Sequence, residues 1–353
     1  MSDVAAGVSL AQRYALHVRK RALGLLGLLV LVAALFAVDL STGPSGMSLS
    51  TVWQGLWNAE ALELGQRVIL WEVRLPAATM ALLVGGALGL AGAQMQTVLN
   101  NPLASPFTLG LSAAATVGAS LSIVMGFTAW GLGEHVAVPL SAFGGAAVAA
   151  LLIHLLAWRW GASVSVVVLF GIALMFTFEA LLWLLQFLAD SNALQQIVFW
   201  SMGSLGRSTW PKAMVLATVL GLCFAWTQSQ AWQLTALRSG EDHARSSGVL
   251  VERLRLVSLL RVCLLSATAL SFVGSIGFVG LVGPHIARLV LGEDHRFFLP
   301  ASALAGAAML SAASILSKSL IPGVVLPIGI VTALAGVPVF MALVMRSHKG
   351  LQS

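Results

Sequence analysis

The chain has very few charged residues. Only 9% of its 353 residues are Asp, Glu, Lys or Arg, whereas a soluble domain averages about a quarter. A soluble chain of this length needs a charged shell facing water, so the shortage excludes an ordinary soluble protein. Because 58% of the residues are hydrophobic, the exterior is expected to face lipid.

Catalytic and metal-binding patterns are also missing from the sequence. The two cysteines, Cys223 and Cys263, lie inside apolar runs and form no metal or redox motif. No Gly-x-x-x-x-Gly-Lys-Ser/Thr loop occurs, and residues 203–208 lack its spacing. No His, Asp and Glu cluster of the His-Glu-x-x-His kind is present. We therefore expect no catalytic residue, no metal and no cofactor bound by this chain.

Long apolar runs are abundant. The first follows Arg13, Arg19, Lys20 and Arg21 and could imitate a secretory signal, but no clear small-x-small cleavage site follows it. We expect about ten membrane spans, of which the eighth is short enough to be a half-helix inside the bundle. The predicted spans are 22–38, 76–99, 107–126, 136–158, 164–188, 213–228, 257–280, 284–292, 299–320 and 327–346.

The basic residues indicate the orientation of these spans. The net charge is +6, but the basic residues are spread over short segments between apolar runs, which does not favour nucleic acid binding. With both termini in the cytoplasm, 14 of the 19 basic residues lie inside, as the positive-inside rule favours. The predicted organisation is a cytoplasmic tail (1–21), one transmembrane domain (22–346) with a cytoplasmic loop near 228–256, and a tail (347–353).

Polar residues near the second span form the first segment of interest. Pro76 suits the first turn of a helix, and Gln94 and Gln96 are polar groups that need partners in lipid. Asn101 and Pro102 lie in a Pro-rich stretch that either forms only a turn or contributes to a transport path. Gln94, Gln96 and Asn101 are therefore candidate residues of a path.

A second segment lies in the predicted cytoplasmic loop. Gly240 and Gly248 flank one short helix, Glu241 to Ser247, with acidic residues at its start and Arg245 near its end, as the helix dipole favours. The pattern fits a helix that docks into a partner protein. A solvated loop helix without a partner fits it equally well. The residues concerned are Gly240, Glu241, Asp242, Ala244, Arg245 and Gly248.

Two further sites carry polar groups. Pro284 is expected to begin a short helix, with His285 and Arg288 after it. His285 is a structural residue, a ligand or a proton carrier. Glu179 lies in the middle of the fifth span, where a carboxylate is costly. It either lines the path or is protonated and hydrogen-bonded to a neighbouring helix.

Several short motifs follow one another from about residue 70 to the C-terminus. They include Arg74-Leu75-Pro76, Asn101-Pro102-Leu103-Ala104-x-Pro106, the loop 240–249, Gly280-Leu281-x-x-Pro284-His285-x-x-Arg288 and Leu326-Pro327-Ile328-Gly329. In these motifs the chain resembles the FecCD-type permease family of ABC importers, which transport iron–siderophores, haem and cobalamin.

This resemblance implies a type II ABC importer bundle of ten helices in the bacterial inner membrane. It implies a second permease subunit, two ATPase subunits that use ATP and Mg, and a periplasmic binding protein. The loop 240–248 then resembles a coupling helix, and Arg74 and Lys318 resemble docking residues for the binding protein. The chain departs from the family at Ala77, where a second arginine is common, at Ser239 and Ser247, where leucine is usual, and at Ser314 and Val325, where Asp and Glu are common. These departures leave open whether it pairs with itself or with a related permease.

A ferric siderophore is the expected cargo, with haem or cobalamin as alternatives. A secondary transporter needs ionisable groups along its path, and Glu179 is the one plain candidate. A membrane enzyme is disfavoured because the sequence lacks a cluster of catalytic residues.

Overall fold

The computed structural model describes residues 10–126, 133–160 and 163–350. Within these residues the secondary structure is helical, apart from one isolated bridge between Ile321 and Val324. Residues 1–9 of the predicted N-terminal tail and 351–353 of the C-terminal tail lie outside the described residues. The all-α fold class is confirmed.

Membrane-length helices make up most of the fold. In the described part of the chain, seven helices are long and apolar enough to span a membrane, and three shorter apolar helices accompany them. Together they correspond to the ten predicted spans. They are α1 (Leu10–Ser41), α4 (Leu75–Val98), α5 (Leu111–Met125), α6 (Glu134–Trp160), α7 (Val164–Leu188), α9 (Trp210–Ser229), α12 (Val251–Val273), α13 (Val279–Leu291), α14 (His295–Ser319) and α15 (Ile328–Gly350).

Short helices connect the long ones. Two of them start at side-chain caps: the Ser48 hydroxyl accepts from the Thr51 N–H, and the Asp190 carboxylate accepts from the Ala193 N–H at 2.8 Å. Apart from α11, the short helices were not predicted, because they are too short to register as apolar runs. The short helices are α2 (Leu49–Trp57), η1 (Ala59–Ala61), α3 (Leu64–Val68), η3 (Pro106–Leu109), α8 (Ser191–Ser201), η5 (Leu205–Arg207), α10 (Ala231–Arg238) and α11 (Glu241–Ser246).

The second span begins earlier than predicted. The helix runs continuously from Leu64 to Val98 through a π-helical turn, η2 (Ile69–Arg74). Pro76 has no N–H to donate to the carbonyl group of Glu72, so an α-helical hydrogen bond is lost there in any case. The Leu75 N–H instead donates to Leu70, five residues back. Pro76 therefore lies in the first turn of α4, as predicted, and α4 continues directly from the π-helical turn before it.

The seventh and eighth spans also differ from the prediction. Helix α12 ends at Val273 rather than near residue 280, because Gly274 turns the chain with φ +83°. Helix α13 begins at Val279, so Pro284 lies inside it and does not start it. Five residues precede Pro284 in α13, so the proline lies past the first turn, and the carbonyl group of Gly280 loses its α-helical donor.

Helix α4 is the centre of the bundle, and small residues allow its neighbours to approach closely. Gly85 and Gly89 face the backbone of α14 at Gly306 and Ser302, at distances that leave no room for a Cβ atom. Gly92 faces the carbonyl group of Gly280 on α13 in the same way. Such close approach is typical of small-x-x-x-small packing faces between membrane helices.

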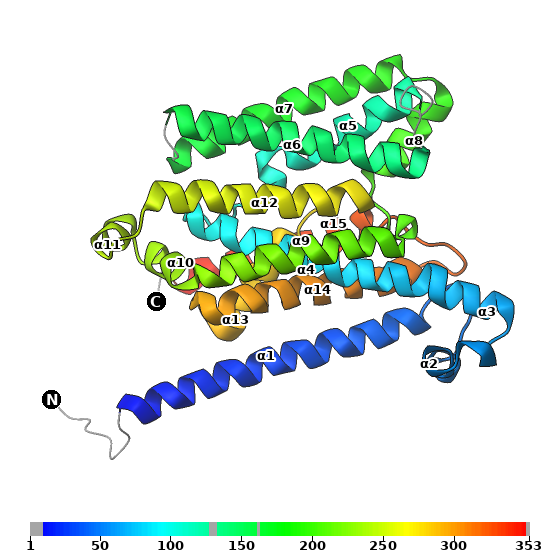
Figure 1. Ribbon diagram of the computed structural model, residues 1–353, viewed down its shortest axis with the longest axis horizontal. Helices are drawn as coiled ribbons and strands as arrows, with labels where there is room; N and C mark the ends of the chain where they lie inside the picture. The colour runs from blue at the N-terminus through cyan, green and yellow to red at the C-terminus, as the bar shows by residue number, and fades with distance from the viewer. Residues whose placement is uncertain (1–9, 127–132, 161–162, 351–353) are drawn as a thin grey trace.

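The helices are arranged so that functional loops gather at two opposite ends (Figure 1). Helix α1 begins at the same end as α10 and α11, and six crossings separate them along the chain. We call this the α11 end. Helices α2, α3 and α8 lie at the opposite end, which we call the distal end.

Candidate functional site

Helix α11 is a short helix held between two glycines with left-handed backbone. Gly240 has φ +126° and Gly248 has φ +83°. Both positions strongly favour glycine, because other residues adopt such angles at a steric cost. The predicted helix is therefore confirmed, ending one residue earlier, at Ser246.

Helix α11 has one buried face and one exposed face. Ala244 is fully buried and packs within the main hydrophobic core, close to α12. Asp242 and His243 are exposed, and Arg245 pairs with Glu252 at 2.6 Å on the surface. The outer face therefore offers charged groups to a partner, while Ala244 fixes the helix to the bundle.

An arginine connects α11 to the bundle core. The buried Arg255 on α12 pairs with Glu241 of α11. Its Nε also donates to the carbonyl oxygen of Val98 at the end of α4, 2.9 Å away. A single side chain thus joins α11 to the helix at the centre of the fold.

Four arginines donate to alternate residues at the end of α4. The last turn of a helix has unpaired carbonyl groups and a negative dipole end, which cations stabilise. The four contacts draw α10, α12 and α13 toward the same end of α4. They are Arg261 Nε to Gln94 Oε1 (2.9 Å), Arg288 to Gln96 Oε1 (3.1 Å), Arg255 Nε to Val98 O (2.9 Å) and Arg238 to Asn100 Oδ1 (2.6 Å).

The predicted path residues are not gathered in one cavity. Gln94 and Gln96 are fully buried and accept hydrogen bonds from the arginines. The side-chain oxygen Oδ1 of Asn101 accepts a hydrogen bond from the Leu103 N–H at 2.9 Å, as in an Asx turn. The exposed Pro102 lies between these two residues. Glu179 is half-buried on α7, with no hydrogen bond or ion pair to another described residue. A path role for these residues stays a prediction.

Glu293 joins two of the four arginines. It pairs with Arg238 at 3.0 Å and with Arg288 at 2.9 Å. Partial burial opposes ionisation of this carboxyl, but the hydrogen bond and charge of Arg238, followed by Arg288, hold its pKa below the ordinary value. Arg288, predicted from its motif, thus belongs to the network that holds α10 against α13. His285, three residues before it, makes no described hydrogen bond.

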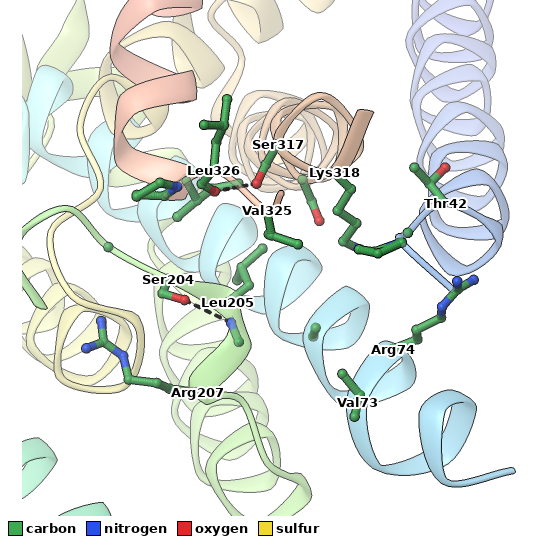
Figure 2. A pocket seen from close by; sticks show the side chains of 18 of the residues that line it. Thr42, Val73, Arg74, Ser204, Leu205, Arg207, Ser317, Lys318, Val325 and Leu326 are labelled. Carbon is green, nitrogen blue, oxygen red and sulfur yellow. Dashed lines mark hydrogen bonds between the residues drawn. The ribbon is translucent and has the colours of Figure 1, made fainter. Parts of the chain in front are cut away.

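The distal end holds a cavity of about 600 Å³ that contains both predicted docking residues. Figure 2 shows Arg74 and Lys318 on the same side of this cavity, with Arg207 on the other side. Arg74 is buried and donates to the Leu40 carbonyl and the Ser45 hydroxyl, each at 2.7 Å. Both docking residues are therefore held by contacts within this chain.

The partner of Lys318 is a residue that the sequence reasoning missed. Lys318 pairs with Asp39 at 2.7 Å, and Asp39 is fully buried. The Ser314 hydroxyl donates to the same carboxylate at 2.9 Å. A carboxylate directly after the first apolar run is itself a signal, because it needs a partner at the membrane boundary.

Pro327 and Gly329 hold the start of α15. The Gly329 N–H donates to the Met202 carbonyl at 3.0 Å, and the carbonyl oxygen of Met202 leaves no room for a Cβ atom at Gly329. Pro327 lines the distal cavity beside Leu326. This motif therefore ties α15 to the turn after α8.

The family model described as the FecCD transport family matches residues 29–346. The chain belongs to the FecCD transport family. It is accordingly a permease of the ABC importer type.

Several relatives and a solved structure are similar to this FecCD permease over nearly its whole length. The hemin transport system permease protein HmuU of Yersinia pestis is 34% identical, covering 92% of this chain and 96% of HmuU. The ferric enterobactin permease FepD of Escherichia coli is 36% identical, covering 94% of this chain and 97% of FepD. The molybdate permease MolB of Haemophilus influenzae is 34% identical, covering 92% of this chain and 96% of MolB. A solved structure of a metal-chelate type ABC transporter in an inward-facing conformation is 32% identical with a TM-score of 0.78. The match covers 91% of this chain and 98% of that chain.

Proposed function

We propose that this permease imports a ferric siderophore across the bacterial inner membrane, driven by two separate ATPase subunits that use ATP and Mg. Helix α11 carries the proposal: it is short, flanked by glycines, exposed on one face and connected to α4 through Arg255. Movement of an ATPase against this face would reach the centre of the bundle through one side chain. The permease would work beside a second permease subunit, either a copy of itself or a relative.

Cargo is the least constrained part of this proposal. Relatives are named for ferric enterobactin, hemin, vitamin B12 and molybdate. Haem and cobalamin are the alternatives to a siderophore. Uptake of labelled ferric siderophores, haem and cobalamin in cells with and without the chain tests the assignment. Uptake of haem or cobalamin alone would replace the siderophore as cargo and leave the permease role intact.

Orientation is a separate part of the proposal, with the α11 end and both termini in the cytoplasm. Cysteines placed one at a time at Asp242 and Ser246, both exposed, should react with a membrane-impermeant maleimide only after the inner membrane is opened. Cysteine at Glu60, exposed in η1 between α2 and α3, is the matched control and should react in intact spheroplasts. Labelling of the α11 positions from outside would overturn the coupling role.

Docking of a periplasmic binding protein is proposed at the distal cavity. Arg74 and Lys318 line it, and acidic groups of the binding protein would meet them there. Docking would use several contacts, so Arg74→Gln should weaken it without abolishing it. Binding-protein affinity that is unchanged in Arg74→Gln, with folding intact, would remove Arg74 from the docking surface.

A further inference from the structure

Two hollows at the distal end join into one. A cavity of about 510 Å³ lies among the start of α6, helix α8 and the η5–α9 turn. A groove of about 630 Å³ lies between α6, α9 and α12. The two are contiguous, because they share the lining residues His135, Pro139, Thr209, Lys212, Ser271 and Phe272.

The cavity part contains two cations that lack an acidic partner. The Arg207 guanidinium donates to the Val273 carbonyl at 3.3 Å and lies over the Trp200 ring, but its buried Nε has no hydrogen-bond partner. Lys212 donates to the Arg207 carbonyl at 2.9 Å. Neither cation is within ion-pair distance of a carboxylate in the described part of the chain. Glu134 is the carboxylate that lines this cavity.

A buried hydroxyl beside these cations is unsatisfied too. Ser208 is 7% exposed, its Oγ has no hydrogen-bond partner, and it lines the same cavity. Buried polar groups normally have partners, and each exception needs an explanation. The Arg207 Nε and the Lys212 ammonium can only donate, and the Ser208 hydroxyl can donate as well, so an acceptor with negative charge would satisfy all three.

The groove part is apolar and lies on the exposed surface of membrane-length helices. Val136, Leu140 and Val215 line it and are 44%, 55% and 50% exposed. They lie on α6 and α9, which with α12 are apolar enough to span a membrane. The occupant of the groove is therefore in the hydrocarbon region, while Lys212 lines both the groove and the cavity. A soluble anion would fill only the cavity.

We propose that this hollow binds one phospholipid with an anionic headgroup. Its phosphate accepts from Arg207, Ser208 and Lys212, and one acyl chain lies in the groove. Basic pockets between membrane helices are known to suit such headgroups. The site is separate from α11 and independent of the cargo. Because Arg207 also lines the distal cavity, the lipid would hold the turn that forms one wall of that cavity.

Native mass spectrometry of the purified complex tests the headgroup contacts. The complex is taken from nanodiscs of phosphatidylcholine with a minor fraction of phosphatidylglycerol. Lys212→Gln should retain phosphatidylglycerol about tenfold less well, the effect of losing one charge-assisted hydrogen bond. Arg67→Gln is the matched control, since Arg67 is an exposed cation at the same end outside the hollow, and it should retain lipid like the unaltered chain. Equal retention by the two variants would overturn the proposal.

A second pair of variants tests the groove and separates a lipid from a free anion. Val215→Trp should fill the groove and lower lipid retention, whereas Val148→Trp, at an exposed α6 position outside it, should not. Thermal unfolding checks that each variant is folded, and Arg207→Lys, which keeps the charge, should retain most of the lipid.

Two further results would exclude a lipid. Protection of the lipid-free complex against thermal unfolding by millimolar inorganic phosphate would identify a soluble-anion site. Crosslinking of residue 215 to another protein chain would show that protein covers the groove. Either result would overturn the lipid assignment.

Discussion

The Nε atom of Arg255 lies 2.9 Å from the carbonyl oxygen of Val98, while the same guanidinium pairs with Glu241 of α11. The first contact reaches the end of α4, the central helix, and the second reaches the helix proposed to meet an ATPase. Arg255 is 3% exposed, so removal of either partner leaves a buried charge less well compensated. The Arg255 side chain thus connects α11 directly to α4, and a movement of α11 would reach α4 through this side chain.

Arg255→Gln should separate ATP hydrolysis from transport. The glutamine is shorter and uncharged, so it loses the ion pair to Glu241 and weakens the contact to Val98. Coupling between sites is typically 1–3 kcal/mol, so we expect the cargo transported per ATP to fall about tenfold. The assay is uptake and ATP hydrolysis by the reconstituted importer. Arg253→Gln, an exposed neighbour, should leave the ratio unchanged. A parallel fall in both rates would indicate only a folding defect.

Gly248→Ala tests the backbone of the α11 loop. At φ +83° an alanine costs about 1–2 kcal/mol, because its Cβ crowds the following carbonyl group. The midpoint of thermal unfolding should fall, and uptake with it. Gly221→Ala is the control: it lies in α9, where an added Cβ meets no atom within 4 Å, and should stabilise by about 0.5–1 kcal/mol. Equal effects of the two substitutions would show that the loop backbone is not constrained.

Periodicity and short motifs in the sequence predict the helices well. The predicted span 164–188 coincides with α7 (Val164–Leu188), since a long apolar run has an unambiguous length. Helix α11 was predicted from its two glycines. Breaks within apolar runs were harder to place, as at Gly274, because the end of α12 is set by a contact across the fold: Ser204 donates to the Val273 carbonyl at 2.7 Å.

Polar pairs formed by distant residues could not be predicted. Gln94 was recognised as a polar group that needs a partner, but its donor, Arg261, lies 167 positions away. Asp39 and Lys318 are separated by 279 positions. No local pattern connects such residues, because the packing of α1 against α14 and of α4 against α12 creates the contact.

Asp39→Asn should destabilise the chain strongly. Asp39 is fully buried and Lys318 is 12% exposed, so loss of the carboxylate leaves a largely buried ammonium group without its counter-charge. Such a break typically costs about 3–5 kcal/mol of the free energy of unfolding. Ser314→Ala removes one hydrogen bond to the same carboxylate and should cost about 1 kcal/mol. Thermal unfolding in detergent shows which of the two substitutions destabilises the chain more.

A double variant separates charge from shape at this pair. Asp39→Asn combined with Lys318→Met leaves no buried charge, so it should be more stable than Asp39→Asn alone. If the double variant is instead less stable than Asp39→Asn alone, the interaction is chiefly one of packing, and the ion-pair interpretation is wrong.

Glu293→Gln should remove part of the pH dependence of stability at the α11 end. The pKa of Glu293 is held below its ordinary value of 4.5 by Arg238 and Arg288, against the opposing effect of burial; His295 is the other titratable group facing it. A carboxyl with a lowered pKa in the folded state stabilises that state above the unfolded pKa, and this contribution is lost as the pH falls through the folded pKa. The unaltered chain should therefore exceed the variant in thermal midpoint at pH 7. The difference should shrink as the pH falls below 4.5 and vanish once the pH is below the folded pKa. Glu60→Gln, an exposed carboxyl in η1 between α2 and α3, is the control. A constant difference from pH 7 to pH 3 would show that the two arginines do not act on Glu293 through its charge.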